Sequence, residues 1–154
     1  MKKYVGLIIL VVLGLTIITG CGSMQNNSLE IIMYELQTHE YYEHLNNVPT
    51  KYYIDSQKEL NNFYTLYEDF EKMNINKDTF SNNKIFIQVI QENSGDINID
   101  LIDVIFDNKA INFVVQREGL GVTDDMACWY LVAIIPNEKL DGIKFNEWIK
   151  PSGA

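Results

Sequence analysis

One stretch of the chain repeats large apolar residues at spacings of three and four, which places them on one face of a helix. These residues are Leu60, Phe63, Tyr64, Tyr67 and Phe70. The stretch opens with Ser56-Gln57-Lys58-Glu59, a capping box in which the serine accepts from a helix amide and the glutamate reaches back. The pattern predicts a helix of about 15 residues that begins after Ser56 and packs its aromatic face on a sheet. Binding of a ligand is the other use of such a face.

Apolar runs and alternations predict strands on both sides of this helix. Residues 29–36 favour a strand, with a short helix as the alternative. Residues 51–54 favour a second strand before the helix, and residues 84–91 favour a strand after it. Residues 97–106 alternate between apolar and polar, but the phase changes once. Ile97, Ile99 and Leu101 carry the first phase, and Ile102, Val104 and Phe106 carry the second. A shift of one residue is what a β-bulge produces.

The last third of the chain continues this strand-rich pattern. Residues 110–117 complete a predicted β-meander with the two preceding strands. Residues 126–135 are apolar on both faces, which predicts a central strand covered on both sides, or one in contact with a partner. Residues 143–148 predict a last edge strand. The order therefore predicts an α+β fold: an antiparallel β-sheet of about five strands with one main helix packed on one face.

The beginning of the chain has a different pattern. Lys2 and Lys3 precede an uncharged apolar run from Val5 to Ile18, and the segment ends Thr19-Gly20-Cys21. This order predicts a secretory signal peptide, because its apolar core of about 14 residues is shorter than the ~20 that span a membrane. It resembles the lipobox of bacterial lipoproteins, which implies cleavage before Cys21 and lipidation of its thiol. An uncleaved anchor and a plain secreted protein are the alternatives.

These features divide the chain into three parts. Residues 1–20 form the predicted signal peptide, and residues 21–27 form a short polar tether. Residues 28–150 form one predicted globular domain. If Cys21 carries the lipid, the domain is held on the extracytoplasmic face of the cell membrane. More than one acyl chain is needed for stable anchoring, and lipoproteins commonly carry several.

Charge and cysteine content narrow the choice of partners. The chain has 12 Lys+Arg and 21 Asp+Glu, a net charge of −9, which becomes −11 when Lys2 and Lys3 leave with the signal. Such a surface repels nucleic acid and anionic lipid headgroups, so we exclude nucleic acid as a partner. Lipidation of Cys21 leaves Cys128 without an intramolecular partner, so the domain depends on its core alone.

Two patterns superficially suggest catalytic or zinc chemistry. Cys128 with His39 or His44 could pair a thiol with a base, but Cys128 lies in an apolar run without a nearby cation, so we expect a buried structural thiol. His39 and His44 are five residues apart, about 140° around a helix, and do not match the zinc spacing of four. We expect neither an enzyme nor a zinc site.

A third pattern suggests calcium. Asp96-x-Asn98-x-Asp100 begins like a calcium-binding loop, but Leu101 replaces the sixth-position glycine and Asp107 replaces the twelfth-position glutamate. The polar face of a strand explains the same residues. We therefore expect no bound metal and no cofactor.

The stretch from Gly119 to Asp125 is the best candidate for a contact with a protein partner. Gly119-x-Gly121 lacks the third glycine and the strand–helix setting of a phosphate loop. Asp124 and Asp125 can form an acidic contact, and the flanking aromatics Trp129 and Tyr130 extend the candidate surface. The alternative is a solvated turn.

Residues 52–146 resemble the PrcB-like family, which is named from a subunit of a protease complex. The matching positions are Ser56, Glu59, Leu60, Phe63, Phe80, Gly95, Gly119, Thr123, Tyr130 and Pro136. The chain has Ala127-Cys128-Trp129-Tyr130 where the family pattern Thr-x-Pro-Tyr is expected, so the proline is absent. Members are often bacterial lipoproteins, in agreement with Cys21. The resemblance implies a non-catalytic partner or chaperone of a surface protease.

Taken together, the patterns predict a membrane-anchored lipoprotein that acts as a non-catalytic, protein-binding accessory. The alternative is a small-molecule or solute-binding lipoprotein with a pocket between Phe63, Tyr64, Tyr67 and the sheet. A filled core at that place would remove this alternative.

Overall fold

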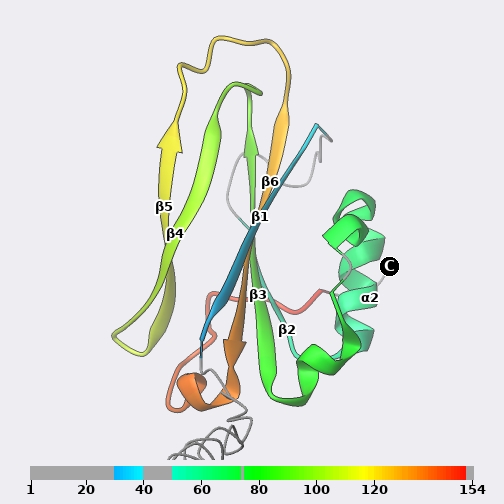
Figure 1. Ribbon diagram of the computed structural model, residues 1–154, viewed down its shortest axis with the longest axis vertical. Coiled ribbons are helices and arrows are strands. Elements are labelled where there is room, and N and C mark those ends of the chain that lie inside the picture. Colours follow the sequence, from blue (N-terminus) through cyan, green and yellow to red (C-terminus); the bar gives the residue numbers. More distant parts are fainter. Residues whose placement is uncertain (1–29, 40–49, 74, 152–154) are drawn as a thin grey trace, which may run out of the picture.

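The computed structural model describes residues 30–39, 50–73 and 75–151 (Figure 1). This part of the chain has six strands: β1 (Ile32–Thr38), β2 (Thr50–Ile54), β3 (Asn83–Glu92), β4 (Asn98–Asp107), β5 (Ala110–Glu118) and β6 (Ala127–Pro136). The α-helix is α2 (Gln57–Leu66), and the 3-10 helices are η2 (Glu68–Met73), η3 (Lys77–Ser81) and η4 (Asn137–Leu140). The predicted α+β class is confirmed.

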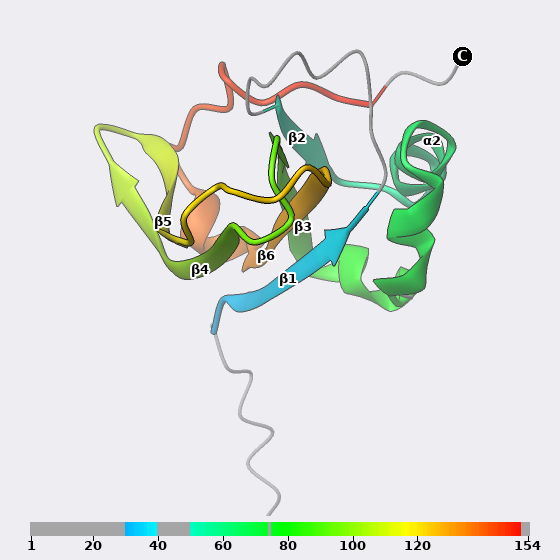
Figure 2. The same cartoon turned by 90° about the horizontal axis from the view of Figure 1, so that it is seen from above.

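The strands form two antiparallel sheets. The larger one has four strands in the order β1-β6-β3-β2, and β4 with β5 forms a separate hairpin. Figure 2 shows the hairpin on one side of the larger sheet and α2 on the other. The predicted β-meander is therefore wrong, because β3 pairs with β6 and β2 and the chain leaves the sheet before β4 begins. The hairpin instead packs Ile99, Leu101 and Val104 into the core.

Strand β6 is the centre of the molecule, and all ten of its residues are buried. Cys128, Tyr130, Val132 and Ile134 belong to the core on the helix side. Trp129, Leu131, Ala133 and Ile135 belong to the core on the hairpin side. The prediction of a central strand covered on both faces is confirmed, and apolar alternation on both phases is the sequence signal for it.

Helix α2 begins as predicted. The Ser56 hydroxyl accepts from the Glu59 backbone N–H at 3.3 Å, and the Glu59 carboxylate accepts from the Asp55 backbone N–H at 2.8 Å. The helix has 10 residues, fewer than expected, because Tyr67 leaves the helical conformation at φ −138° and ψ 82°. Phe70 then follows in η2, and the centroid of its ring lies 4.8 Å from that of the Phe63 ring. Phe63, Tyr67 and Phe70 of this face are buried in the core, as expected, and Tyr64 packs against it half-buried.

The predicted bulge in β4 is confirmed. The register with β5 shifts between Leu101 and Asp103, and Ile102 is 51% exposed while Leu101 and Val104 are buried. The extra residue at the bulge lets the apolar residues before it, such as Leu101, and after it, such as Val104, face the same core.

The C-terminal segment, residues 141–151, does not form the predicted edge strand at 143–148. It crosses the molecule from η4 to the start of α2, and only Ile149 makes a strand-like bridge, parallel to Tyr52. Trp148 explains this course, because its side chain is buried against Phe86 and Phe113, with ring centroids 5.0 and 5.3 Å away. A side chain buried in the core holds the segment across the domain, so that it meets the edge strand β2 only around Ile149.

Candidate functional site

The predicted contact loop, residues 119–125, joins β5 to β6 at one end of the molecule. Figure 1 places this loop at the end of the long axis opposite to the end at which β1 begins. The strand register agrees, because Ile32 lies opposite Ile134 whereas Thr38 lies opposite Cys128, close to the loop. All seven residues of the loop are exposed.

The loop is fixed to the turn between β3 and β4 by hydrogen bonds. The Ser94 hydroxyl lies 2.6 Å from the Asp96 carboxylate and accepts from the Thr123 backbone N–H at 2.9 Å. The hydrogen bond from Ser94 lowers the pKa of Asp96, and hydrogen bonds from the backbone of residues 120–122 lower it further. The backbone of residues 120–122 therefore lies close to the Asp96 carboxylate, which together with Ser94 ties the exposed loop to the β3–β4 turn.

Asp125 is also part of this bonding. Its carboxylate accepts from the Gly95 backbone N–H at 3.2 Å. The hydrogen bond from the Thr123 side chain, followed by that from Gly95, lowers the pKa of Asp125. A Cβ at Gly95 would lie 1.9 Å from a carboxylate oxygen of Asp125, so a larger residue there would displace the Asp125 side chain. Asp125 therefore serves the loop itself, and Asp124 is the predicted acid placed for an external contact.

The loop exposes two aliphatic side chains that the sequence analysis did not single out. Leu120 is 85% exposed and Val122 is 72% exposed, the highest values among the large hydrophobic side chains that the structure describes. A sequence signal did exist, since both residues stand next to glycines in a stretch without strand periodicity. Gly119 and Gly121 have φ of +121° and +66°, which glycine adopts without strain.

Trp129 and Tyr130 do not belong to this surface. They are 5% and 0% exposed and lie on opposite faces of β6. Tyr130 donates to the buried carboxylate of Asp69 at 2.6 Å. The Trp129 indole Nε1 has no hydrogen-bond partner within the described ranges. The interpretation of these aromatics as contact residues is corrected to core residues, because β6 is covered on both sides.

Cys128 is a fully buried free thiol, as predicted. Burial raises the pKa of Cys128 to about 12, so the nucleophilic thiolate is scarce near neutral pH. His39 is exposed. His44 and the predicted lipidation residue Cys21 lie outside the described residues.

The pocket predicted beside the helix aromatics is filled. Phe63 and Tyr67 are completely buried, and Phe63 meets the rings of Tyr52 and Phe70 at 5.1 and 4.8 Å. A groove lies elsewhere, with a volume of about 300 Å³. Its lining comes from β1, β3, β6, η3 and the two residues before η3: Ile32, Tyr34, Ile75, Asn76, Thr79, Asn83 and Ile134.

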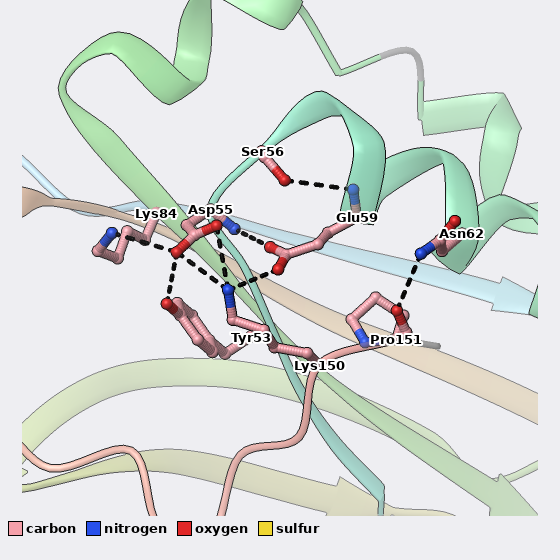
Figure 3. A network of polar contacts seen from close by, with 8 residues as sticks. All are labelled: Tyr53, Asp55, Ser56, Glu59, Asn62, Lys84, Lys150 and Pro151. Atoms are coloured by element: carbon pink, nitrogen blue, oxygen red, sulfur yellow. Dashed lines mark hydrogen bonds and ion pairs between the residues drawn. The ribbon is translucent and has the colours of Figure 1, made fainter. Parts of the chain in front are cut away.

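A cluster of charged residues holds the C-terminal segment (Figure 3). Lys150 Nζ lies 3.2 Å from Asp55 and 2.5 Å from Glu59, and it stands over the Tyr53 ring at 4.8 Å from the centroid. The Pro151 carbonyl accepts from the Asn62 amide at 3.2 Å. These contacts join the C-terminal segment to β2 and to the start of α2, so the cluster stabilises the fold.

The electrostatics of this cluster favour its charged form. Partial burial raises the pKa of Asp55, but hydrogen bonds from Tyr53 and Lys150 outweigh burial and lower the pKa to about 2. The hydrogen bond with Glu59 raises the pKa of Lys150. The two groups are therefore ionised across the physiological pH range.

Comparisons with protein-family models, curated proteins and solved structures find no match to this chain. In the described ranges, no three His, Cys, Asp or Glu side chains are arranged to hold a metal ion. The helices in these ranges are too short or too polar to cross a membrane.

Proposed function

We propose that this protein is a membrane-anchored extracytoplasmic lipoprotein that binds another protein without catalysing a reaction on it. The observation that carries the proposal is the fixed loop of residues 119–125, which exposes Leu120 and Val122. Because hydrogen bonds from Ser94 and Asp96 already hold the loop, a partner binds it without a large loss of loop entropy. Two exposed aliphatic side chains on a fixed backbone supply the apolar centre of a contact.

The placement of the loop supports an outward-facing contact. A lipid on Cys21 leaves eight residues before Glu30, which reach at most about 29 Å when fully extended. The first strand then begins near the membrane, and the loop lies at the opposite end of the molecule (Figure 1). In this orientation Leu120 and Val122 meet a partner that approaches from outside the membrane.

The charge around the loop indicates the kind of partner. Glu118 and Asp124 are exposed beside the two aliphatic residues. The nearest basic residue in sequence, Arg117, is held by two hydrogen bonds to Glu92 at 2.8 and 3.0 Å. An acidic rim disfavours insertion of the loop into anionic lipid and favours a protein with an apolar pocket and basic margins. A surface protease, which the PrcB-like resemblance implies, is one such partner.

A photo-crosslinking amino acid at Glu118, an exposed position beside the loop, tests the contact on intact cells. We expect capture of a specific protein that Leu120→Ser/Val122→Ser reduces at least tenfold and that 0.5 M salt reduces as well. Ile102→Ser, at an exposed position on β4, is the matched control and should leave capture unchanged. Capture that is absent, or equal in the loop variant, overturns the proposed contact.

The anchor is tested separately by metabolic labelling with a palmitate analogue. The native protein should be labelled and Cys21→Ala should not. Equal signal in both proteins, or none in either, contradicts the lipoprotein assignment while leaving the loop contact open to its own test.

A further inference from the structure

The two edges of the four-stranded sheet differ in their protection. At one edge, the C-terminal segment covers β2: Tyr53 donates its backbone N–H to Ile149 at 2.9 Å, and Ile149 donates to Lys51 at 2.9 Å. At the other edge is β1, which pairs with β6 on its inner side. No strand within the described ranges pairs with its outer side. An open strand edge is a template for pairing with another chain.

Strand β1 also lacks the usual features that block such pairing. Residues 30–38 contain no lysine, arginine or proline, and the register with β6 is continuous without a bulge. The charged residue of β1, Glu35, accepts from the Leu101 backbone N–H at 2.8 Å and is therefore turned towards β4. Ile32, Met33 and Tyr34 are 47%, 38% and 41% exposed. A seven-residue strand edge that exposes three large apolar side chains is costly to leave open unless it is used.

The groove of about 300 Å³ runs beside this edge on the helix side. Ile32 and Tyr34 contribute to it from β1, and Ile75 and Thr79 contribute from the opposite wall at η3. A strand added to β1 would direct every second side chain to this face, next to Ile32 and Tyr34. The groove therefore offers space for these side chains between the apolar residues Ile32, Tyr34 and Ile134 and the residues at η3.

Charge complements the apolar groove. Residues 30–38 carry two carboxylates, Glu30 and Glu35, and no cation, within a chain of net charge −9. Glu35 lies on the hairpin face of β1, because the groove-lining residues have the opposite parity. The alternate side chains of an added strand would meet this face, where basic residues are favoured.

We propose that the outer edge of β1 binds an extended peptide segment of a partner protein by strand addition. The segment alternates apolar residues, which enter the groove, with basic residues, which face Glu35. This inference depends on the proposed protein-binding function for the nature of the partner, but it uses a surface distinct from the loop of residues 119–125.

Fluorescence anisotropy with defined peptides tests the proposal, using protein purified in detergent from cells that express the full chain. The probe is a labelled nine-residue peptide of alternating valine and lysine. We expect saturable binding that weakens at least tenfold when valine alternates with glutamate, or when a proline replaces the central valine. Ile32→Lys should weaken binding at least tenfold. Ile105→Lys, at a position of similar exposure on the hairpin (44% against 47%), should not.

Each remaining outcome overturns the proposal. No saturable binding, or equal binding to both lysine variants, removes the β1 site. If sedimentation shows a dimer of the native protein that Ile32→Lys dissociates, a second copy occupies the edge. Hydrogen exchange of the β1 backbone amides is measured before peptide is added. If the amides on the outer edge exchange as slowly as those paired with β6, another part of the chain already covers the outer edge. Leu120→Ser/Val122→Ser should bind the peptide normally, so failure of the loop contact and failure of this site are separately visible.

Discussion

Ser94 and Thr123 place their side-chain oxygens 2.6 Å apart although 29 residues separate them in the chain. This contact joins the β3–β4 turn to the β5–β6 loop. It matters because Asp96, which Ser94 orients, accepts from the amides of the loop that exposes Leu120 and Val122. The conformation of the proposed contact surface thus depends on a pair of small hydroxyl residues that the partner itself would not touch.

Thr123→Val is expected to loosen the loop. It keeps the side-chain shape but removes the hydroxyl that contacts Ser94 and accepts from the Asp96 N–H at 3.2 Å. We expect a loss of about 1–2 kcal/mol in the free energy of unfolding and faster hydrogen exchange at residues 120–122. Urea unfolding and exchange mass spectrometry measure the two effects.

Thr65→Val is the matched control for this change. The Thr65 hydroxyl donates to the Asn61 carbonyl on the exposed side of α2, so its loss should cost less and leave loop exchange unaltered. Unchanged exchange at residues 120–122 in Thr123→Val would contradict the role given to the Ser94–Thr123 contact.

Acid should weaken the attachment of the C-terminal segment through Asp55. The pKa of Asp55 is lowered from 3.8 to about 2, so its ionised form stabilises the fold above about pH 4, and this contribution is lost as the pH falls towards 2. The difference in unfolding free energy between the native protein and Asp55→Asn should therefore shrink by about 1–2 kcal/mol between pH 5 and pH 2. Urea titrations followed by tryptophan fluorescence measure it.

Asn146→Ser controls for general acid effects, because Asn146 is exposed in the C-terminal segment and carries no titratable group. Its difference from the native protein should not change over the same pH range. A constant difference for Asp55→Asn as well would show that the cluster around Lys150 contributes no pH-dependent stability.

Structural features that depend on neighbouring residues were predictable from the sequence. The capping box at Ser56 and Glu59 fixed the start of α2, because capping involves neighbours within one helical turn. The phase change at Ile102 indicated the bulge, and the apolar alternation around Cys128 indicated a strand buried on both faces. Each of these features is encoded within about ten consecutive residues.

Features that depend on distant residues were not predictable. The alternation in β3 and β4 shows which face is apolar but not which strand pairs with which, so the separation of the hairpin was missed. The assignment of Trp129 and Tyr130 to a surface contact followed their nearness in sequence to the acidic loop, although the apolar pattern of residues 126–135 already indicates a strand covered on both faces. The contact between Ser94 and Thr123 joins two turns, and neither turn alone indicates it.

Tyr130→Phe should be among the most destabilising conservative changes in the core. The Tyr130 hydroxyl donates to the Asp69 carboxylate at 2.6 Å, and both side chains are buried. Loss of a hydrogen bond to a buried charged group costs about 2–3 kcal/mol. Tyr34→Phe, at a position 41% exposed on β1, should cost less than about 0.5 kcal/mol. Chemical unfolding compares the two, and equal stabilities would contradict the importance of the Asp69 contact.

Cys128 should react with alkylating reagents only when the domain unfolds. The thiol is fully buried, and its pKa of about 12 leaves roughly one molecule in 10⁴ as thiolate at pH 8. In Cys21→Ala, Cys128 is the single cysteine of the chain, so iodoacetamide labelling measured by mass spectrometry reports on it alone. We expect the labelling rate in native buffer to be at least 10³-fold below that in 6 M urea.

The labelling rate of Cys128 should rise in Tyr130→Phe in proportion to the loss of stability, because opening of the core then becomes more frequent. Rapid labelling of the native protein would show instead that the helix-side core around β6 opens readily, and it would make a reactive role for this thiol the better interpretation.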